Sequence, residues 1–151
     1  MSDIGIEDRL LIQELSAQYA FAVDTKRYAD APALFAEDGI WDETVLGIPR
    51  CEGRDAIAAF FPLMSQTDLE FLIHINANHR IVDFDGNNAW GTVHLHAAGR
   101  MNGSDMTIYG YYDDAYIKCD GRWLFQDRKL VAITPPLGDF HVDQATAAAG
   151  G

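Results

Sequence analysis

A histidine lies in the middle of an apolar segment, FLIHINANH, which runs from Phe71 to His79. Side chains of an extended segment alternate between two faces, so His74 shares a face with Leu72 and Asn76. A buried imidazole is costly unless its ring nitrogens have polar partners, and we expect another part of the chain to supply one. With such a partner His74 can work as a general base; the alternative is a core histidine with a structural role only.

Two further charged residues occupy unusual positions. Asp24 directly follows a predicted helix, where a carboxylate meets the unfavourable end of the helix dipole, although a simple turn residue is the alternative. Arg128 lies inside the last predicted strand. Strict alternation gives it a face with Leu124, Gln126 and Leu130, opposite Phe125, Asp127 and Lys129. An arginine among aliphatic neighbours indicates a charge held in a cavity or, alternatively, a side chain that reaches solvent at a sheet edge.

The pair His94 and His96 has the H-x-H spacing of two metal ligands, but no second ligand motif such as H-E-x-x-H accompanies it. We therefore predict no metal site. The chain also has no phosphate-binding loop, no G-x-G-x-x-G, no G-x-S-x-G and no C-x-x-C. We accordingly predict chemistry without a cofactor.

Composition limits the classes of function. The 151 residues are 48% hydrophobic and carry a formal net charge of -12, as expected for one globular domain. We assign residues 1–135 to this domain and 136–151 to a C-terminal tail. The negative charge argues against nucleic-acid or anionic-membrane binding, which needs clustered basic residues. No apolar run is long enough to span a membrane and Met1 to Ile6 does not resemble a signal peptide, so we expect a cytoplasmic protein.

The order of the predicted elements indicates an α+β protein with helices packed on a mainly antiparallel sheet. Apolar residues at helical spacing predict a helix over 7–23, with Leu11, Leu15, Tyr19 and Ala22 on its buried face. We further predict a short helix over 30–39, a strand over 40–45 and a helix over 53–60. From Glu70 onward the chain alternates as strands, with tight turns at Asp85-Gly86-Asn87, Asn102-Gly103 and Asp120-Gly121.

Several of these residues together resemble the SnoaL-like family. The features are Tyr19 and Asp24 at the end of the first helix, a histidine on the first long strand, an arginine on the last, the helical G-R-D-A-I segment and the D-G-R-W-L-F hairpin. The resemblance covers about residues 6–133. It implies the cone-shaped fold of nuclear transport factor 2, in which a strongly curved sheet and the helices enclose an internal pocket.

Within this family the sequence is most similar to scytalone dehydratase, hexachlorocyclohexane dehydrochlorinase and bile-acid 7α-dehydratase. Their aspartate and histidine pair falls on Asp24 and His74, the arginine of the dehydrochlorinase on Arg128, and a tyrosine of the bile-acid enzyme on Tyr19. The resemblance implies that His74 is the base and Asp24 orients it. Arg128 would then anchor a carboxylate or stabilise the leaving group, while Tyr19 and Tyr112 would donate hydrogen bonds to the substrate.

The sequence also departs from these relatives. Gly99 falls where scytalone dehydratase has a second catalytic histidine, Leu95 and Ala97 lie on the strand that carries an acid in the bile-acid enzyme, and Tyr19 replaces a lysine of the dehydrochlorinase. The same alignment turns His94 and His96 away from the pocket. The predicted dyad is thus kept while the groups specific to each substrate are not.

We predict a cofactor-independent lyase that eliminates water or halide from a small hydrophobic ligand, cyclic or carboxylate-bearing. Its binding residues would be Tyr112, Leu72, Asn76, Trp41, Phe60 and Leu95. The alternatives are an isomerase or polyketide-cyclase-type enzyme of the same fold, and a ligand-binding or accessory subunit resembling the β subunit of ring-hydroxylating dioxygenases. An outer sheet face carrying Trp90, His94 and His96 predicts a homodimer or homotrimer.

Overall fold

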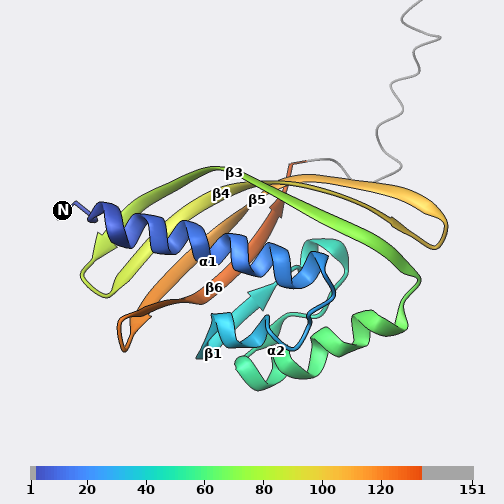
Figure 1. Ribbon diagram of the computed structural model, residues 1–151, viewed down its shortest axis with the longest axis horizontal. Helices are drawn as coiled ribbons and strands as arrows, with labels where there is room; N and C mark the ends of the chain where they lie inside the picture. Colours follow the sequence, from blue (N-terminus) through green and yellow to red (C-terminus); the bar gives the residue numbers. More distant parts are fainter. Residues whose placement is uncertain (1–2, 134–151) are drawn as a thin grey trace, which may run out of the picture.

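The computed structural model of the protein describes residues 3–133. Their helical elements are α1 (Ile6–Asp24), η1 (Pro32–Leu34), η2 (Thr44–Leu46), α2 (Arg54–Phe60) and η3 (Phe61–Gln66). The strands are β1 (Phe35–Asp42), β2 (Cys51–Glu52), β3 (Leu69–Asp85), β4 (Asn88–Met101), β5 (Ser104–Cys119) and β6 (Arg122–Ala132). Figure 1 shows α1 crossing one face of the sheet, with α2 beside it.

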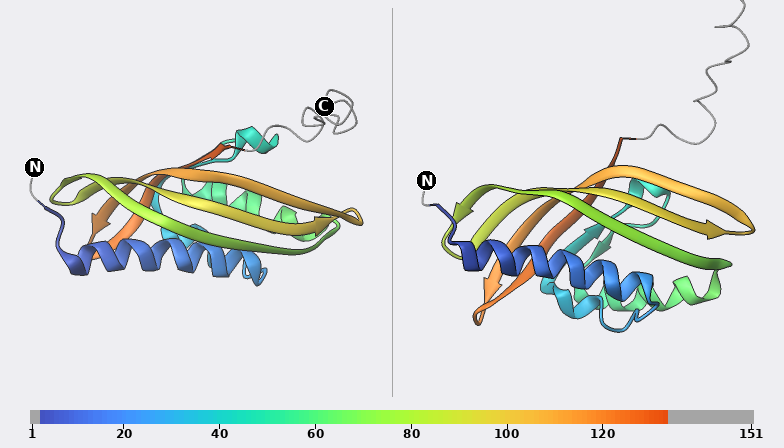
Figure 2. Two further views of the ribbon diagram at one scale, coloured as in Figure 1. Left: turned by 90° about the horizontal axis from the view of Figure 1, so that it is seen from above. Right: turned by 45° about the horizontal axis from the view of Figure 1, so that its top comes forward.

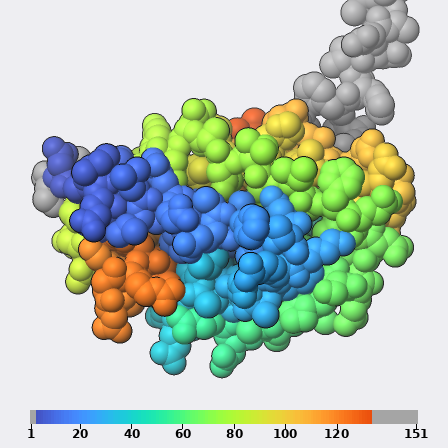
Figure 3. Space-filling model, in the orientation of Figure 1, coloured from blue at the N-terminus to red at the C-terminus, as the bar shows by residue number. Residues whose placement is uncertain are grey.

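The six strands form one curled sheet in the order β2-β1-β6-β5-β4-β3. All neighbours pair antiparallel except β1 and β6, which are parallel. The two further views show the long strands bending over α1, so that the sheet and helices form an incomplete cone (Figure 2). In the space-filling view α1 and the segment up to η3 cover the inner face of the sheet (Figure 3). The predicted α+β fold is confirmed.

Local sequence signals account for the helix and the hairpins. Helix α1 buries Leu15, Tyr19 and Ala22 as predicted, whereas Leu11 stays 42% exposed at the margin of the packed face. The two-residue turns Asn102-Gly103 and Asp120-Gly121 have positive φ at both positions, which these residue types tolerate best. Both turns connect neighbouring antiparallel strands, with Met101 paired to Ser104 and Cys119 paired to Arg122.

The predicted helix over 30–39 is wrong. Only Pro32–Leu34 forms a helical turn, and Phe35 begins strand β1, where it pairs with Phe125 of β6. Apolar residues in this short segment fit a helix or a buried strand equally well, and pairing with β6 decides for the strand. The predicted strand over 40–45 is correspondingly earlier in the chain, since β1 ends at Asp42.

Strand β3 changes its inward face part of the way along. Phe71, Ile73 and Ile75 are about half exposed on the outer face, as alternation predicts. An irregularity in the pairing between Ala77 and Arg80, with Asn78 at a φ of 51°, then shifts the alternation by one residue. Bulges of this kind redirect side chains. As a result His79 lies on the same inner face as His74.

The predicted tail, 136–151, lies outside the described residues. Within residues 3–133 no helix has both the length and the apolar character needed to cross a membrane.

Candidate active site

Asp24 and His74 form a close pair across 50 residues of sequence. Asp24 Oδ1 lies 2.5 Å from His74 Nδ1, and Asp24 Oδ2 accepts a hydrogen bond of 2.9 Å from the His74 backbone N–H. The carboxylate therefore fixes both the strand and the imidazole ring. With Nδ1–H donating to Asp24, the lone pair of Nε2 is available, and among the described residues nothing is hydrogen bonded to Nε2.

The end of α1 is held against β3, and this positions the pair. Asp24 is the last residue of α1, where its charge is unfavourable to the helix dipole, but the hydrogen bonds from His74 compensate for that. Two residues later Lys26 Nζ donates to the backbone oxygen of Leu69, the first residue of β3. The two contacts lock the helix end to the strand and leave the His74 side chain only 7% exposed.

His74 lines a cavity of about 370 Å³ between the inner face of the sheet and the segment 43–67. The wall is mostly apolar. It includes the predicted residues Phe60, Leu72, Leu95 and Tyr112, together with Leu46, Ile48, Met64, Thr67, Leu69, Ala97, Met101, Met106, Thr107, Ile108 and Leu130. Such an apolar wall with few polar groups is typical of a small-molecule site.

The cavity wall also contains Glu43, which our sequence prediction missed. Glu43 follows the last residue of β1 and is only 7% exposed. The side chain of Asp42 accepts hydrogen bonds from the backbone N–H and hydroxyl of Thr44, which stabilises the turn that directs Glu43 inward. The sequence held a signal for this: in the strand predicted over 40–45, Glu43 is two residues beyond Trp41 and shares its face.

Two tyrosines and a tryptophan surround the Glu43 carboxyl group. The hydroxyls of Tyr19 and Tyr112 each donate to Oε1 at 3.3 Å, and Trp41 Nε1 donates to the Tyr19 hydroxyl at 2.8 Å. Burial raises the pKa of Glu43, against the charges of His74 and Arg128 and the two tyrosine hydrogen bonds, which favour the ionised form. Burial, and then the Glu43 charge, raise the pKa of both tyrosines, so both remain neutral donors.

Arg128 lies behind this cluster and not in the cavity wall. It is fully buried and makes a bidentate ion pair with Asp114, at 3.0 Å through Nε and 2.7 Å through Nη2. Nη2 also donates to the hydroxyl of Ser16. Burial lowers the pKa of Arg128, but the Asp114 carboxylate raises it by more, so the pKa of Arg128 lies above its ordinary value. The network continues through the Tyr116 hydroxyl, which donates to Asp114 and lies 3.0 Å from His79 Nε2.

The predicted facing of β6 is wrong around Phe125. The Arg128 guanidinium carbon lies 4.0 Å from the ring centroids of Phe125 and Tyr112, so both Phe125 and Arg128 point inward. The pairing of β5 with β6 shifts register between Ala115 and Tyr116, and this bulge breaks the strict alternation that the prediction assumed.

The ten predicted site residues therefore divide into two groups. His74, Tyr112, Leu72, Phe60 and Leu95 line the cavity. Asp24 touches it only through His74, and Tyr19 and Trp41 only through the hydrogen-bond chain to Glu43. Arg128 forms its ion pair with Asp114 away from the cavity wall, and Asn76 donates to the backbone oxygen of Ser16 instead of reaching the cavity.

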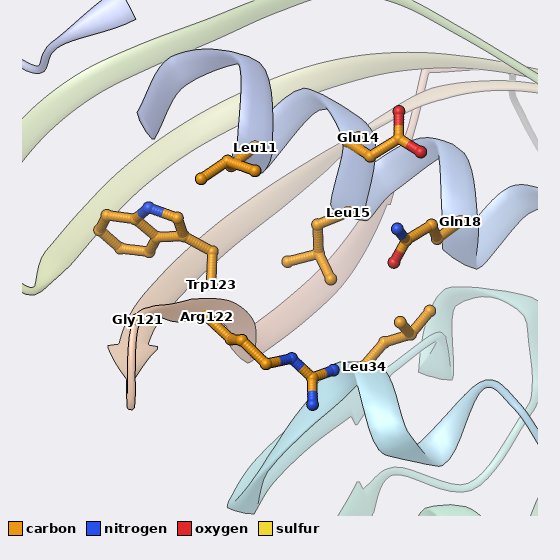
Figure 4. A pocket seen from close by; sticks show the side chains of 8 residues that line it. All are labelled: Leu11, Glu14, Leu15, Gln18, Leu34, Gly121, Arg122 and Trp123. Atoms are coloured by element: carbon orange, nitrogen blue, oxygen red, sulfur yellow. The ribbon is translucent and has the colours of Figure 1, made fainter. Parts of the chain in front are cut away.

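A second hollow, of about 170 Å³, lies between α1 and the β5–β6 hairpin. Figure 4 shows Leu11 and Leu15 of α1 above Trp123, with Glu14 and Gln18 at the margin of the hollow. It holds no histidine and no buried acid. His94 and His96 are exposed on the outer sheet face, and among residues 3–133 no group of three His, Cys, Asp or Glu side chains is placed so that it could hold a metal ion.

The fold and this cavity define the class of protein. A family model described as a SnoaL-like domain matches residues 5–129, and the chain belongs to that family. At Gly99 a Cβ would lie 2.6 Å from the backbone oxygen of Phe71, so β4 takes only glycine there without a shift.

Solved structures are similar over most of the chain. A proposed aromatic ring hydroxylase from Novosphingobium aromaticivorans is 25% identical, with a TM-score of 0.82 over 88% of this chain and 94% of that one. A proposed scytalone dehydratase from the same organism is 23% identical, with a TM-score of 0.76 over 85% and 86%. A type 3 hexachlorocyclohexane dehydrochlorinase from Novosphingobium barchaimii is 19% identical, with a TM-score of 0.76 over 90% and 94%. Among curated proteins none matches the sequence.

Proposed function

We propose that the protein is a lyase that removes a proton from carbon and expels a leaving group from the adjacent carbon of a small hydrophobic, cyclic substrate. The observation that carries this proposal is the Asp24–His74 pair at the cavity wall, with Nε2 unoccupied by any described residue. Nε2 takes the proton, while Asp24 keeps the proton on Nδ1 and stabilises the imidazolium that forms. The apolar wall accommodates a ring and excludes water.

The names of two similar structures, a scytalone dehydratase and a hexachlorocyclohexane dehydrochlorinase, agree with this reaction class. The substrate roles that the sequence suggested for Arg128 and Tyr19 receive less support. The Arg128 charge is already paired with Asp114, and the Tyr19 hydroxyl already donates to Glu43. We propose that both act as supports of the cavity wall.

Two cyclic ketones test the base. Incubation of 3-hydroxycyclohexanone and 3-chlorocyclohexanone with the protein in heavy water reports deuterium entry next to the carbonyl by NMR and the enone product by absorbance. We expect His74→Gln to lower kcat/KM for both compounds by about 10²–10⁴-fold, the usual contribution of a general base. The matched control is His96→Gln on the outer face, which leaves the rate unchanged. A wild-type protein no faster than buffer, or an equally active His74→Gln, contradicts the proposal.

A second candidate is a non-catalytic subunit of a ring-hydroxylating enzyme, which the name of the similar Novosphingobium aromaticivorans structure favours. Such a subunit would co-purify with a larger partner in fixed ratio and would not exchange deuterium into either ketone. An isomerase or cyclase of the same fold would exchange deuterium but release no water or chloride.

We also propose that the outer sheet face is covered in a homodimer or homotrimer. Ile75 is 55% exposed there, and Phe71, Ile73, Trp90 and Tyr109 are similarly exposed. An apolar face of this kind is costly to leave in water. Light scattering of the wild type is expected to give two or three chain masses, and Ile75→Lys to give a monomer. A wild-type monomer contradicts the proposal.

A further inference from the structure

Among the described residues, Glu43 is the one acidic group of the cavity wall that the His74–Asp24 mechanism leaves unused. Oε1 accepts both tyrosine hydrogen bonds, from Tyr19 and Tyr112. Among the described residues nothing is hydrogen bonded to Oε2. A protonated carboxyl group has one oxygen that only accepts and one that carries the proton. In a protonated Glu43 the two donors on Oε1 therefore assign the carbonyl role to that oxygen and leave Oε2 to carry the proton.

The charges that face Glu43 connect its proton to the state of His74. Tyr19 and Tyr112 are neutral, and the charge of Arg128, which also favours ionised Glu43, stays constant because Arg128 remains paired with Asp114. His74 carries a positive charge only after it has accepted a proton, and that charge favours ionisation of Glu43. Proton removal from the substrate by His74 thus makes Glu43 a stronger acid at the stage when the leaving group departs. Burial raises the pKa of Glu43, which is the direction that a general acid requires.

We propose that Glu43 is the general acid of this site and that it makes the protein a dehydratase of alcohols, whereas the elimination of a halide does not need Glu43. This inference rests on the proposed function above. His74 Nε2 takes the proton from carbon, the C–H electron pair forms the new C=C bond, and the C–O bond breaks with its pair moving to oxygen. The Glu43 Oε2 proton joins that oxygen and water leaves. The proton on His74 then returns through water to Glu43, which restores both groups.

The leaving group decides whether an acid is needed. Hydroxide is a poor leaving group and gains from protonation, whereas chloride departs as the anion and needs no proton. The substrate class therefore depends on Glu43 and the base step on His74.

The test compares Glu43→Gln with the wild type on the two ketones used above. For 3-hydroxycyclohexanone we expect kcat/KM for enone formation to fall by about 10²–10⁴-fold, and for 3-chlorocyclohexanone by less than about threefold. His74→Gln lowers both rates, so a failure of the base and a failure of the acid give different patterns. Equal losses of Glu43→Gln on the two ketones, or no loss on the alcohol, overturn the acid role while leaving the lyase proposal intact.

An infrared measurement tests the proton on Glu43 without any turnover. The difference spectrum of wild type minus Glu43→Gln at pH 7 is expected to contain the C=O stretch of a protonated carboxyl group, and this band shifts in heavy water. The control Glu37→Gln, at an exposed glutamate of β1, gives no such band. A spectrum with only carboxylate bands at position 43 overturns the proposal even if neither ketone is a substrate.

Discussion

Two groups of buried polar residues lie on the inner face of the sheet, and they differ in whether they reach the cavity. The cavity cluster consists of Asp24, His74 and Glu43 with Tyr19 and Tyr112. The sealed network consists of Arg128, Asp114, Ser16, Tyr116 and His79. In the sealed network the ion pair is bidentate and further hydrogen bonds surround it. The buried Arg128 Nη1 has no hydrogen-bond partner among the described residues, but Arg128 does not line the cavity. In the cavity cluster the atoms without a hydrogen-bond partner among these residues, His74 Nε2 and Glu43 Oε2, belong to side chains of the cavity wall.

The rings of Tyr19 and Tyr112 are the boundary between the two groups. Their faces lie over the Arg128 guanidinium, at 4.7 and 4.0 Å, while their hydroxyls reach Glu43. The comparison shows that a buried charge does not by itself mark a reactive site. What distinguishes the cavity cluster is that two of its titratable side chains, His74 and Glu43, line the cavity.

The largest expected effect concerns the sealed network. Arg128→Met leaves the buried Asp114 without its cation, and we expect the free energy of unfolding, measured by urea denaturation, to fall by about 3–5 kcal/mol. The double variant Arg128→Met with Asp114→Leu removes both charges and recovers most of that loss. If Arg128→Met instead leaves stability unchanged and abolishes turnover of the ketones, Arg128 belongs to the catalytic group and the division between the two groups fails.

In the cavity cluster the expected effect is on rate. Asp24→Asn keeps the shape of the side chain but no longer stabilises the imidazolium, so kcat/KM for both ketones falls by about 10²-fold. The proton on Nδ1 gives a second measurement: a strongly hydrogen-bonded N–H resonates far downfield in the proton NMR spectrum, and Asp24→Asn moves that signal upfield. An unchanged signal would show that Asp24 does not accept this proton.

The division between the groups could be predicted only in part from the sequence. Helix α1, helix α2 and the hairpins follow from periodicity and turn residues, which act over short distances. The Asp114–Arg128 pair depends on a bulge. The register set by the turn, in which Cys119 pairs with Arg122, would continue by placing Asp114 opposite Asp127, but the shift after Tyr116 places Arg128 there. The one extra residue at this bulge replaces a repulsive pair by an ion pair, and no local pattern in the sequence predicts the bulge.

The candidate site shows the same limit. Alternation correctly predicted that His74 and Leu72 point inward, and the family resemblance identified Asp24 as the partner of His74. Glu43 was missed although the strand predicted over 40–45 places it on the same face as Trp41, because only Trp41 of that strand was considered. Tyr19 and Trp41 could be predicted as inward-facing, but the hydrogen bonds that direct them toward Glu43 depend on the packing of α1 against β1, which alternation does not specify.

A smaller effect is expected at the boundary between the groups. Tyr112→Phe removes one of the two donors to Glu43 while its ring still covers Arg128, and a hydrogen bond of this kind contributes about 1 kcal/mol. We expect about a fivefold loss in kcat/KM on 3-hydroxycyclohexanone and none on 3-chlorocyclohexanone. The matched control is Tyr111→Phe, whose ring packs near His94 on the outer face. Equal losses on the two ketones would mean that Tyr112 contacts the substrate itself.

The smallest effect is on the pH dependence of stability. Because burial raises the pKa of Glu43 above its ordinary value of 4.5, folded protein holds a proton that the unfolded chain releases as the pH passes 4.5. The free energy of unfolding therefore falls as the pH rises from about 4.5 to the raised pKa, by at most about 1.4 kcal/mol per pH unit. The variant Glu43→Gln lacks the pH dependence that Glu43 contributes. The free energy of unfolding of Glu43→Gln relative to that of the wild type therefore increases with pH over that range and is constant below it.

Urea denaturation of both proteins, with Glu37→Gln as the exposed control, measures the difference. A relative stability of Glu43→Gln that decreases as the pH rises would mean that the folded protein favours ionised Glu43, and the cavity cluster would then resemble the sealed network in holding a stabilised charge.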